Sequence, residues 1–269
     1  MPRVAIDAMG GDYAPQEIVL GALKALEHSR ELEIILVGDK EKIAPLITSS
    51  NNNRLSIYHT SQFISGDDDP GLSIRRKKDS SMVKAIELVR SGEAHAVLSA
   101  GNTGALMAAG LLFLGRIKNV SRPALLTVFP TFNGGNVVVL DVGANMDAKP
   151  ENLWQYAIMG KLYAQELLNK DNPRVALLNV GIEENKGNQQ IRKTFSLFQD
   201  KVPGFIGNVE ANAIFQGTTD VLVSDGFIGN IVLKLVEGLS QDIFSALKNE
   251  LNKNTRAKIG AFMMMPSLK

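Results

Sequence analysis

The chain has 269 residues, with 29 Lys and Arg against 28 Asp and Glu, three histidines and no cysteine. A formal net charge of +1 argues against a nucleic-acid-binding protein that relies on a large positive field, although it leaves room for a local basic patch. The lack of cysteine excludes disulfides, a thiol nucleophile, iron–sulfur clusters and cysteine-based zinc sites, and it fits a reducing compartment. Any chemistry must therefore use carboxylates, cations, amides, hydroxyls and backbone groups, and we expect neither a metal nor a cofactor.

The sequence also shows neither a signal peptide nor a segment long enough to cross a membrane. Its first residues, MPRVAIDAMGGDYAP, lack the basic region and long apolar stretch of a signal peptide. The most apolar internal segment, residues 105–114, is far shorter than the roughly 20 residues that a spanning helix needs. We therefore expect a soluble or peripheral protein.

Short β-branched runs alternate with helical patterns along the chain, which is typical of a parallel α/β sheet. The predicted strands, in chain order, are residues 3–7, 32–37, 55–59, 94–99, 124–129, 137–141, 175–179, 204–207 and 220–223. The predicted helices are residues 15–28, 40–47, 81–91, 103–115, 150–168 and 188–198, and a last helix begins near residue 229. Residues 65–79 form a charged excursion from the sheet. With no convincing boundary, we expect a single domain over residues 1–269 that ends in an amphipathic helical region at residues 229–269.

Glycine and small polar residues follow one predicted strand after another, in segments that begin at Asp7, Gly38, Ser99, Asp141, Asn179 and Ser224. Each segment by itself is compatible with a tight turn or a helix cap. In an open parallel sheet, however, all of them lie at the carboxyl ends of the strands, where ligands bind, so we expect them to converge on one crevice.

The segment Ser99-Ala-Gly-Asn-Thr-Gly104 is the best anion cradle in the chain, because glycine admits a close ligand and the following helix offers unpaired N–H groups. Glu183, Glu184 and Lys186 lie on a turn after another strand. There, Lys186 either binds phosphate as a point charge or faces water with the two carboxylates. Neither a P-loop nor a G-x-G-x-x-G dinucleotide fingerprint is present.

Several ordered motifs point to a known family. They are Asp7-Ala-Met-Gly-Gly-Asp12, Arg75-Arg-Lys-Lys78, Ser99-Ala-Gly-Asn-Thr-Gly104, Gly115-Arg-Ile-Lys118 with Arg122-Pro123, Asp141-Val-Gly-Ala-Asn145 with Lys149-Pro-Glu151, and Asp225-Gly-Phe with Gly229-Asn230. Together they resemble the bacterial phosphate acyltransferase family, the PlsX type, in register from Arg3 to about Glu237. The resemblance implies an enzyme of fatty acid and phospholipid biosynthesis that converts acyl-(acyl carrier protein) and inorganic phosphate to acyl phosphate.

The resemblance also implies a fold and an assembly. The fold is a three-layer α/β/α arrangement with a mostly parallel sheet, like isopropylmalate dehydrogenase or phosphotransacetylase. The enzyme would be a cytoplasmic homodimer that associates reversibly with the inner face of the membrane. The family pattern further predicts Gly-Gly-Ala and Leu-Phe-Gly-Leu segments and another helix beyond Lys269.

Moving an acyl group from a thioester to phosphate needs no protein nucleophile, because phosphate itself attacks. The protein must place the phosphate and supply donors for the developing oxyanion. We expect Asn102, Lys186 and Asp7 to be catalytic, with Asn102 or a backbone N–H facing the carbonyl oxygen. Phosphate and substrate would be bound by Gly10, Gly11, Gly101, Thr103, Asp141, Asn145, Asn179, Asp225 and Asn230.

Two further segments indicate partners. Arg75, Arg76, Lys77 and Lys78 form either a solvated surface or a contact for the acidic carrier protein. The residues Ile228, Val232, Leu235, Leu239, Ile243 and Leu247 recur at steps of three or four, as in an amphipathic helix that packs in the core or a dimer interface. After three cations, the cluster Phe262, Met263, Met264 and Met265 suits insertion into an anionic membrane surface.

Other functions remain open at this stage. A phosphotransacetylase that uses acyl-CoA would share the phosphate crevice. A non-catalytic scaffold for the carrier protein or the membrane belongs to a different class. A dehydrogenase of the same broad fold is disfavoured, because the sequence shows no dinucleotide fingerprint, no clustered carboxylate metal site and no arginine triad.

Overall fold

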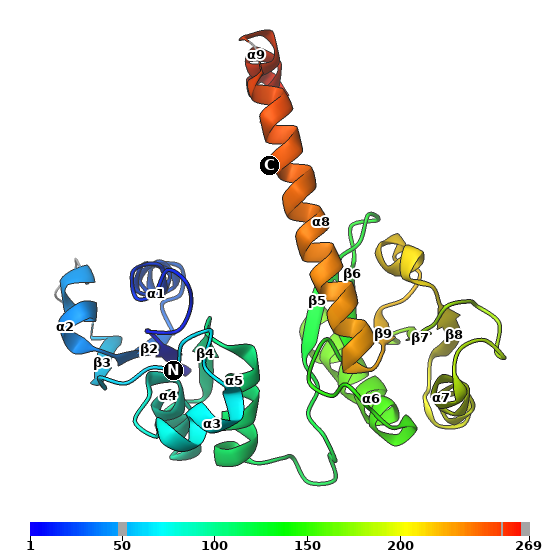
Figure 1. Ribbon diagram of the computed structural model, residues 1–269, viewed down its shortest axis with the longest axis horizontal. Coiled ribbons are helices and arrows are strands. Elements are labelled where there is room, and N and C mark those ends of the chain that lie inside the picture. The colour runs from blue at the N-terminus through cyan, green and yellow to red at the C-terminus, as the bar shows by residue number, and fades with distance from the viewer. Residues whose placement is uncertain (48–52, 254, 265–269) are drawn as a thin grey trace. The chain divides into compact units, whose positions relative to one another are not determined.

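The computed structural model describes residues 1–47, 53–253 and 255–264. The chain forms two compact units, Met1–Asn119 and Val120–Lys269, and each unit is built on its own β-sheet (Figure 1). All nine predicted strands are present, with ends within a few residues of the prediction. The single domain expected from the sequence stays a prediction.

The first unit has a parallel four-stranded sheet in the order β3-β2-β1-β4. Its strands are β1 (Arg3–Asp7), β2 (Glu33–Gly38), β3 (Leu55–His59) and β4 (Ala96–Ser99). Helix α1 (Gln16–His28) buries Val19 and Leu26 on one face of the sheet. Helix α4 (Ser81–Arg90) buries Ala85 and Leu88 on the other face, so the unit has three layers.

The remaining helices of the first unit are α2 (Lys40–Ile43), the 3₁₀ turn η1 (Ala44–Leu46), α3 (Pro70–Arg76) and α5 (Thr103–Ala109), which continues as the π-helical turn η2 (Gly110–Leu114). Helix α3 lies in the charged excursion of residues 65–79, where no helix is predicted from the sequence. Asp69 Oδ1 accepts from the backbone N–H of Leu72 (2.7 Å) and Pro70 fills the first helical position, so the helix starts with two strong local signals. Its only buried residues are Ser73 and Ile74, too few to give an apolar period.

The second unit has a five-stranded sheet in the order β5-β6-β9-β7-β8. Its strands are β5 (Leu126–Pro130), β6 (Asn136–Leu140), β7 (Val175–Leu178), β8 (Phe205–Val209) and β9 (Val221–Val223). All pairs are parallel except the β5–β6 hairpin. Helices α6 (Pro150–Leu168) and α7 (Gln189–Lys201) cover one face, and the 3₁₀ helix η3 (Ala211–Gln216) and the start of α8 cover the other. The predicted three-layer, mostly parallel α/β class is therefore confirmed.

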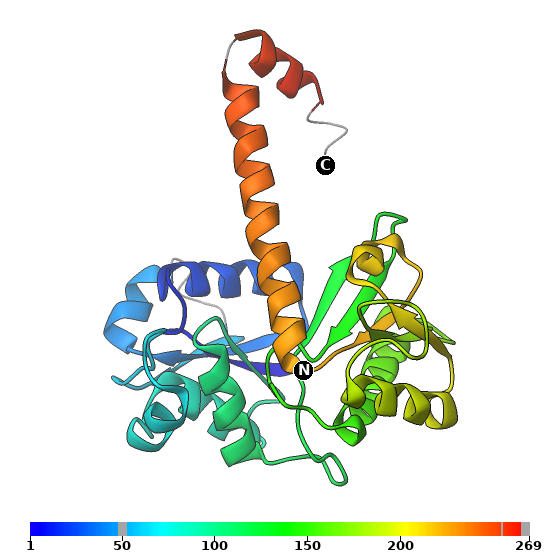
Figure 2. The same cartoon turned by 45° about the vertical axis from the view of Figure 1, so that its right-hand side comes forward.

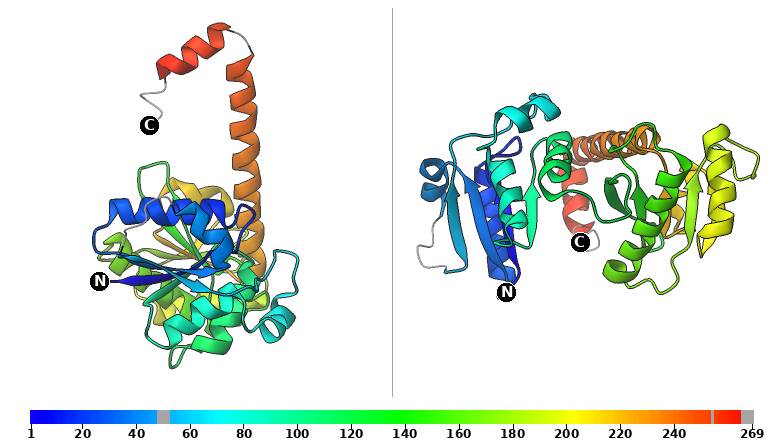
Figure 3. Two further views of the ribbon diagram at one scale, coloured as in Figure 1. Left: turned by 90° about the vertical axis from the view of Figure 1, so that its left-hand side faces the viewer. Right: turned by 90° about the horizontal axis from the view of Figure 1, so that it is seen from below.

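Helix α8 (Gly226–Asn252) starts three residues earlier than predicted, because Asp225 caps it through a bond from the Ile228 N–H (2.8 Å). Val232 and Val236 pack on the sheet, and the helix then runs well beyond the sheet of its unit (Figure 2). Helix α9 (Thr255–Met264) turns away from the axis of α8 (Figure 3). Within the described residues, none of the helices combines the length and apolarity that crossing a membrane requires.

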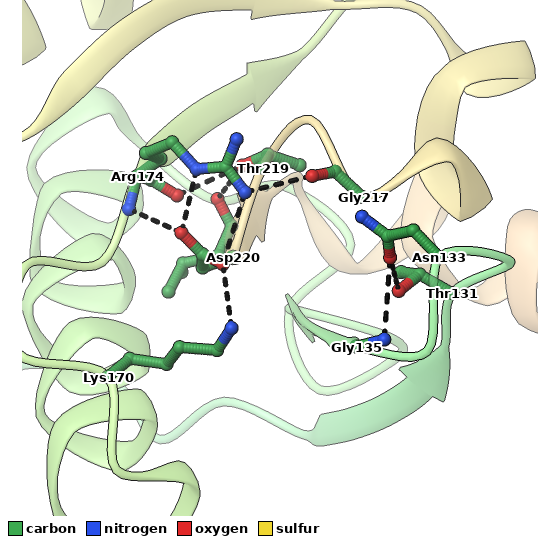
Figure 4. Close-up of polar contacts among 9 residues, drawn as sticks. Thr131, Asn133, Gly135, Lys170, Arg174, Gly217, Thr219 and Asp220 are labelled. Carbon is green, nitrogen blue, oxygen red and sulfur yellow. Dashed lines mark hydrogen bonds and ion pairs between the residues drawn. The ribbon is translucent and has the colours of Figure 1, made fainter.

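A polar cluster ties the amino ends of β7 and β9 together (Figure 4). Arg174 donates to Asp220 Oδ2 from Nε and from its backbone N–H, both at 2.9 Å, and to the carbonyl of Gly217 at 2.8 Å. Lys170 Nζ lies 3.5 Å from Asp220 Oδ1. Burial opposes ionisation of Asp220, but the bonds from Arg174 outweigh it, and the pKa of Asp220 is lowered. Because it lies opposite the carboxyl ends of these strands, the cluster stabilises the fold and is no part of the candidate site.

Candidate functional site

In the first unit, the turns that follow β1 and β4 are bonded to each other through Asp7. This carboxylate is 1% exposed, and its Oδ2 accepts from Ser99 Oγ at the end of β4 (2.7 Å). Ser99 Oγ accepts in turn from the backbone N–H of Gly101 (3.1 Å). Asp7 thus holds the two turns in place. Ser99, to which the sequence analysis gave no role by itself, completes the connection.

The glycines of these turns are required by close packing. A Cβ on Gly10 would lie 2.4 Å from Asp7 Oδ2, and a Cβ on Gly101 would lie 3.2 Å from Gly10 Cα. Gly11 has a φ of +111°, which side chains rarely adopt. The two turns therefore meet backbone to backbone, and substituting Gly10 would force them apart.

A cavity of about 240 Å³ opens beside the turns; we call it the Gly11 pocket, lined in part by Gly11, Asp12, Ser65, Ala100, Gly101 and Asn102. Asn102 Oδ1 accepts from the backbone N–H of Ala105 (2.9 Å) and thereby caps α5. Its Nδ2 donates to the carbonyl of Gly66 (3.0 Å). Both ends of the Asn102 amide are therefore bonded within the protein, and Thr103 is exposed as the first residue of α5.

Of the four cations at residues 75–78, one is held in an ion pair and three are exposed. Lys77 Nζ lies 2.5 Å from Asp68 Oδ2, and this hydrogen bond lowers the pKa of Asp68. Arg75, Arg76 and Lys78 are exposed. Arg75 also lines an apolar groove of about 560 Å³ together with Leu72 and Leu112.

In the second unit, the buried carboxylate of Asp141 organises the loop after β6. Its Oδ1 accepts from the backbone N–H groups of Leu125 (3.0 Å), Gly143 (3.1 Å) and Ala144 (2.8 Å). Its Oδ2 accepts from the backbone N–H of Asn145 (2.7 Å) and from Asn145 Nδ2 (3.3 Å). Because five donors already surround this carboxylate, its role in the structure is to shape the loop.

Asn145 extends this network to α6 and to the segment before β5. Its Nδ2 donates to the carbonyl of Pro123 (2.6 Å) and to Tyr156 Oη (2.8 Å). Burial raises the pKa of Tyr156 and nearby Asp141 adds to the rise, while the charge of Arg122 acts in the opposite direction. Arg122 therefore lies close to this network.

Next to the loop is a polar cavity of about 490 Å³; we call it the Arg122 pocket, lined in part by Ser121, Arg122, Asn145, Asp147, Lys149 and Asn152. Of these residues, only Asn145 is predicted to be a site residue from the sequence. Arg122 and Lys149 belong to the motifs that carry the family resemblance. These motifs are the sequence signal that could have identified both as site residues.

A smaller cavity of about 240 Å³ at the ends of β7 and β9, the Asn179 pocket, is lined in part by Asn179, Val180, Gly187, Asn188, Asp225 and Ile228. Asn179 Nδ2 donates to the carbonyl of Lys186 (3.2 Å). Lys186 itself is exposed and does not line this pocket. Asn230 lies instead beside the Asp141 loop, 3.5 Å from where a Cβ on Gly143 would be.

The predicted residues thus divide between the two units, and those of the second unit lie around two separate pockets or outside them. The first unit contains Asp7, Gly10, Gly11, Gly101, Asn102 and Thr103, and the second contains Asp141, Asn145, Asn179, Lys186, Asp225 and Asn230. That the residues of both units converge on a single crevice stays a prediction. Among residues 1–47, 53–253 and 255–264, no group of three or more His, Asp or Glu side chains is arranged to hold a metal ion.

Comparison with known proteins identifies relatives over the whole length. The family model described as "Fatty acid synthesis protein" matches residues 2–269. A phosphate acyltransferase of Anoxybacillus flavithermus is 52% identical over 99% of this chain and 80% of its own length. A phosphate acyltransferase of Geobacillus thermodenitrificans is 51% identical with the same coverage. Among solved structures, a branched-chain phosphotransacylase from Enterococcus faecalis aligns with a TM-score of 0.55 at 19% identity, over 87% of this chain and 83% of that one, which supports the fold.

Proposed function

Because the chain belongs to the fatty acid synthesis protein family, we propose that it is a phosphate acyltransferase that transfers an acyl group from a thioester donor to inorganic phosphate. The observation that carries the proposal is the 52% identity over 99% of the chain to a protein of that name. The lack of cysteine agrees with it, because phosphate is the nucleophile and the carbonyl carbon exchanges its bond to sulfur for a bond to phosphate oxygen.

We assign roles to the predicted residues according to whether their side-chain atoms already form hydrogen bonds within the protein. Asp7, Asp141 and Asn102 position backbone turns, because their oxygen atoms already accept bonds within the protein. In the first unit, the oxyanion donor would be a backbone N–H of the glycine-rich turns. Asn179 is likewise bonded at both ends of its amide, to the carbonyl of Lys186 and the N–H of Val180. Lys186, Asp225, Asn230 and the glycines remain candidates for substrate contact.

We also propose acyl carrier protein as the donor. The three exposed cations Arg75, Arg76 and Lys78 beside an apolar groove fit an acidic protein that carries an apolar acyl chain. Acyl-CoA is the alternative donor.

The test is to incubate the full chain with an acyl donor and inorganic phosphate and to trap acyl phosphate as its hydroxamate with hydroxylamine. We expect phosphate-dependent hydroxamate with acyl-(acyl carrier protein) at a rate that falls as salt screens the basic patch. A reaction without phosphate is the control, since hydroxylamine also attacks thioesters. Turnover of acyl-CoA alone would identify a phosphotransacetylase, and carrier binding without any hydroxamate would identify a scaffold.

The exposed apolar side chains of α8 and α9 support two further proposals. Leu235, Leu239 and Ile243 are each more than half exposed along one helix, a surface that suits pairing with a second copy of the chain. Phe262 and Met263 are about three-quarters exposed on α9, beside cations, and suit an anionic membrane surface. Met263 and Met264 of the predicted membrane cluster are described and exposed, whereas Met265 lies outside the described residues.

The two surfaces can be separated with matched substitutions. Leu239→Asp should convert a dimer to a monomer in sedimentation equilibrium without lipid. Phe262→Asp should leave the mass unchanged and reduce cosedimentation with anionic phospholipid vesicles. Equal vesicle binding by wild type and Phe262→Asp would contradict the membrane proposal, and an unchanged mass for Leu239→Asp would contradict the dimer proposal.

A further inference from the structure

The residues that line the Arg122 pocket include two cations and one carboxylate. Neither Arg122 nor Lys149 forms an ion pair in the part of the chain that the structure describes, whereas Lys77, Lys84 and Arg174 all do. Asp147 is the one carboxylate on the wall, against two cations. An anion in the pocket would balance the net positive charge of these lining residues.

The backbone that presents these cations is fixed on both sides. Before Arg122, the backbone N–H and the hydroxyl of Ser121 donate to Gln155 Oε1 (2.9 and 2.7 Å). After Arg122, the carbonyl of Pro123 accepts from Asn145 Nδ2 (2.6 Å). The arginine therefore extends from a segment held to both α6 and the Asp141 loop, which reduces the ordering that ligand binding requires.

Neutral donors complete the wall. The carboxylate of Asp141 accepts from the backbone N–H groups of Ala144 and Asn145. The next two backbone N–H groups, those of Met146 and Asp147, donate to no acceptor among the described residues. The backbone N–H of Lys149 donates to Asn152 Oδ1 (2.9 Å), and Asn152 Nδ2 donates to Ser121 Oγ (2.8 Å). The pocket thus combines one guanidinium and one ammonium with two lining residues, Met146 and Asp147, whose backbone N–H groups have no acceptor among the described residues.

We propose that the Arg122 pocket binds a phosphoryl group, with Arg122 as the bidentate donor and Lys149 as a point charge. A guanidinium matches two phosphate oxygens at once, and an ammonium stabilises the remaining charge. The inference rests on the proposed function, in which inorganic phosphate is a substrate. A phosphopantetheine arm of the thioester donor offers the same chemistry.

Binding of inorganic phosphate to the full chain, measured by isothermal titration calorimetry without any acyl donor, tests the assignment. We expect Arg122→Gln to raise the dissociation constant about tenfold or more and Lys149→Gln to raise it several-fold. Lys193→Gln, an exposed cation on α7, is the matched control and should bind like wild type. Arg122→Lys should recover only part of the affinity, because the ammonium cannot bind two oxygens in the same plane.

A second titration with pantetheine 4′-phosphate distinguishes the two sources of the phosphoryl group. If Arg122→Gln weakens inorganic phosphate binding most, phosphate is the ligand; if it weakens pantetheine 4′-phosphate most, the donor arm is the ligand. Either result supports a phosphoryl site. Unchanged binding of both ligands in both variants, or an equal loss in Lys193→Gln, would overturn it.

Because these titrations contain no acyl donor, they are independent of the hydroxamate assay. Phosphate binding that depends on Arg122, in a protein that forms no acyl phosphate, would refute the proposed function and leave the site. Acyl phosphate formation by Arg122→Gln with an unchanged KM for phosphate and an unchanged KM for the acyl donor would refute the site and leave the function.

Discussion

Asp141→Ala should lower the free energy of unfolding of the second unit by about 3 kcal/mol or more. The substitution leaves the N–H groups of Leu125, Gly143, Ala144 and Asn145 without their acceptor, and a buried donor that loses its partner costs about 1–3 kcal/mol. The losses are coupled, so they do not simply add. Urea unfolding followed by the fluorescence of Trp154, which packs on the core of this unit, measures the change.

Asp141→Asn separates shape from charge. An amide keeps one oxygen for the three donors on Oδ1 but places an NH₂ opposite the backbone N–H of Asn145. We therefore expect an intermediate loss of about 1–2 kcal/mol, with faster hydrogen exchange at Asn145. Asp171→Asn, an exposed position with no bond to its side chain among the described residues, is the control. A loss below about 1 kcal/mol in both Asp141 variants would contradict the structural role.

The strands were predictable because each is a short β-branched run bounded by glycine or polar residues. Helix α3 was missed because its cap signals, Asp69 and Pro70, precede a segment with almost no apolar period. The helix predicted over residues 103–115 is present, but its π-helical end was not predictable, because nothing in the composition of residues 110–114 separates α-helical from π-helical bonding.

The sequence predicts that polar residues lie at the strand ends, but it does not show what each of them does there. The sequence predicts Asp141 as a substrate ligand and Asn102 as a catalytic residue, and both roles stay predictions; the structure adds that their side-chain oxygens bond the turns that carry them. Arg122 and Lys149 were missed because only the three-dimensional arrangement shows which cations have a carboxylate beside them and which do not.

Two alanine substitutions in α8 should change stability in opposite directions. Gly229 lies in the first turn of the helix, where a Cβ would be 1.9 Å from the carbonyl oxygen of Asp141 and 2.8 Å from Ser224 Oγ. Gly238 lies further along the same helix with nothing within 4 Å of the corresponding position. Alanine is favoured over glycine in a helix by about 0.8–1.0 kcal/mol, so Gly238→Ala should stabilise the unit by at most that amount.

At Gly229 the same preference is outweighed by the clash. The atom it would meet is backbone at the end of β6, which cannot rotate away as a flexible side chain can, so α8 must move off the sheet. Overpacking typically costs about 1–3 kcal/mol, and we expect Gly229→Ala at or above the upper end of that range. The displacement would also disturb the Asn179 pocket, since Ile228 lines it. Urea unfolding of both variants, followed by Trp154 fluorescence, measures the difference. Shifts of the same sign and size would mean that helix propensity dominates at both positions and that α8 does not dock closely through Gly229.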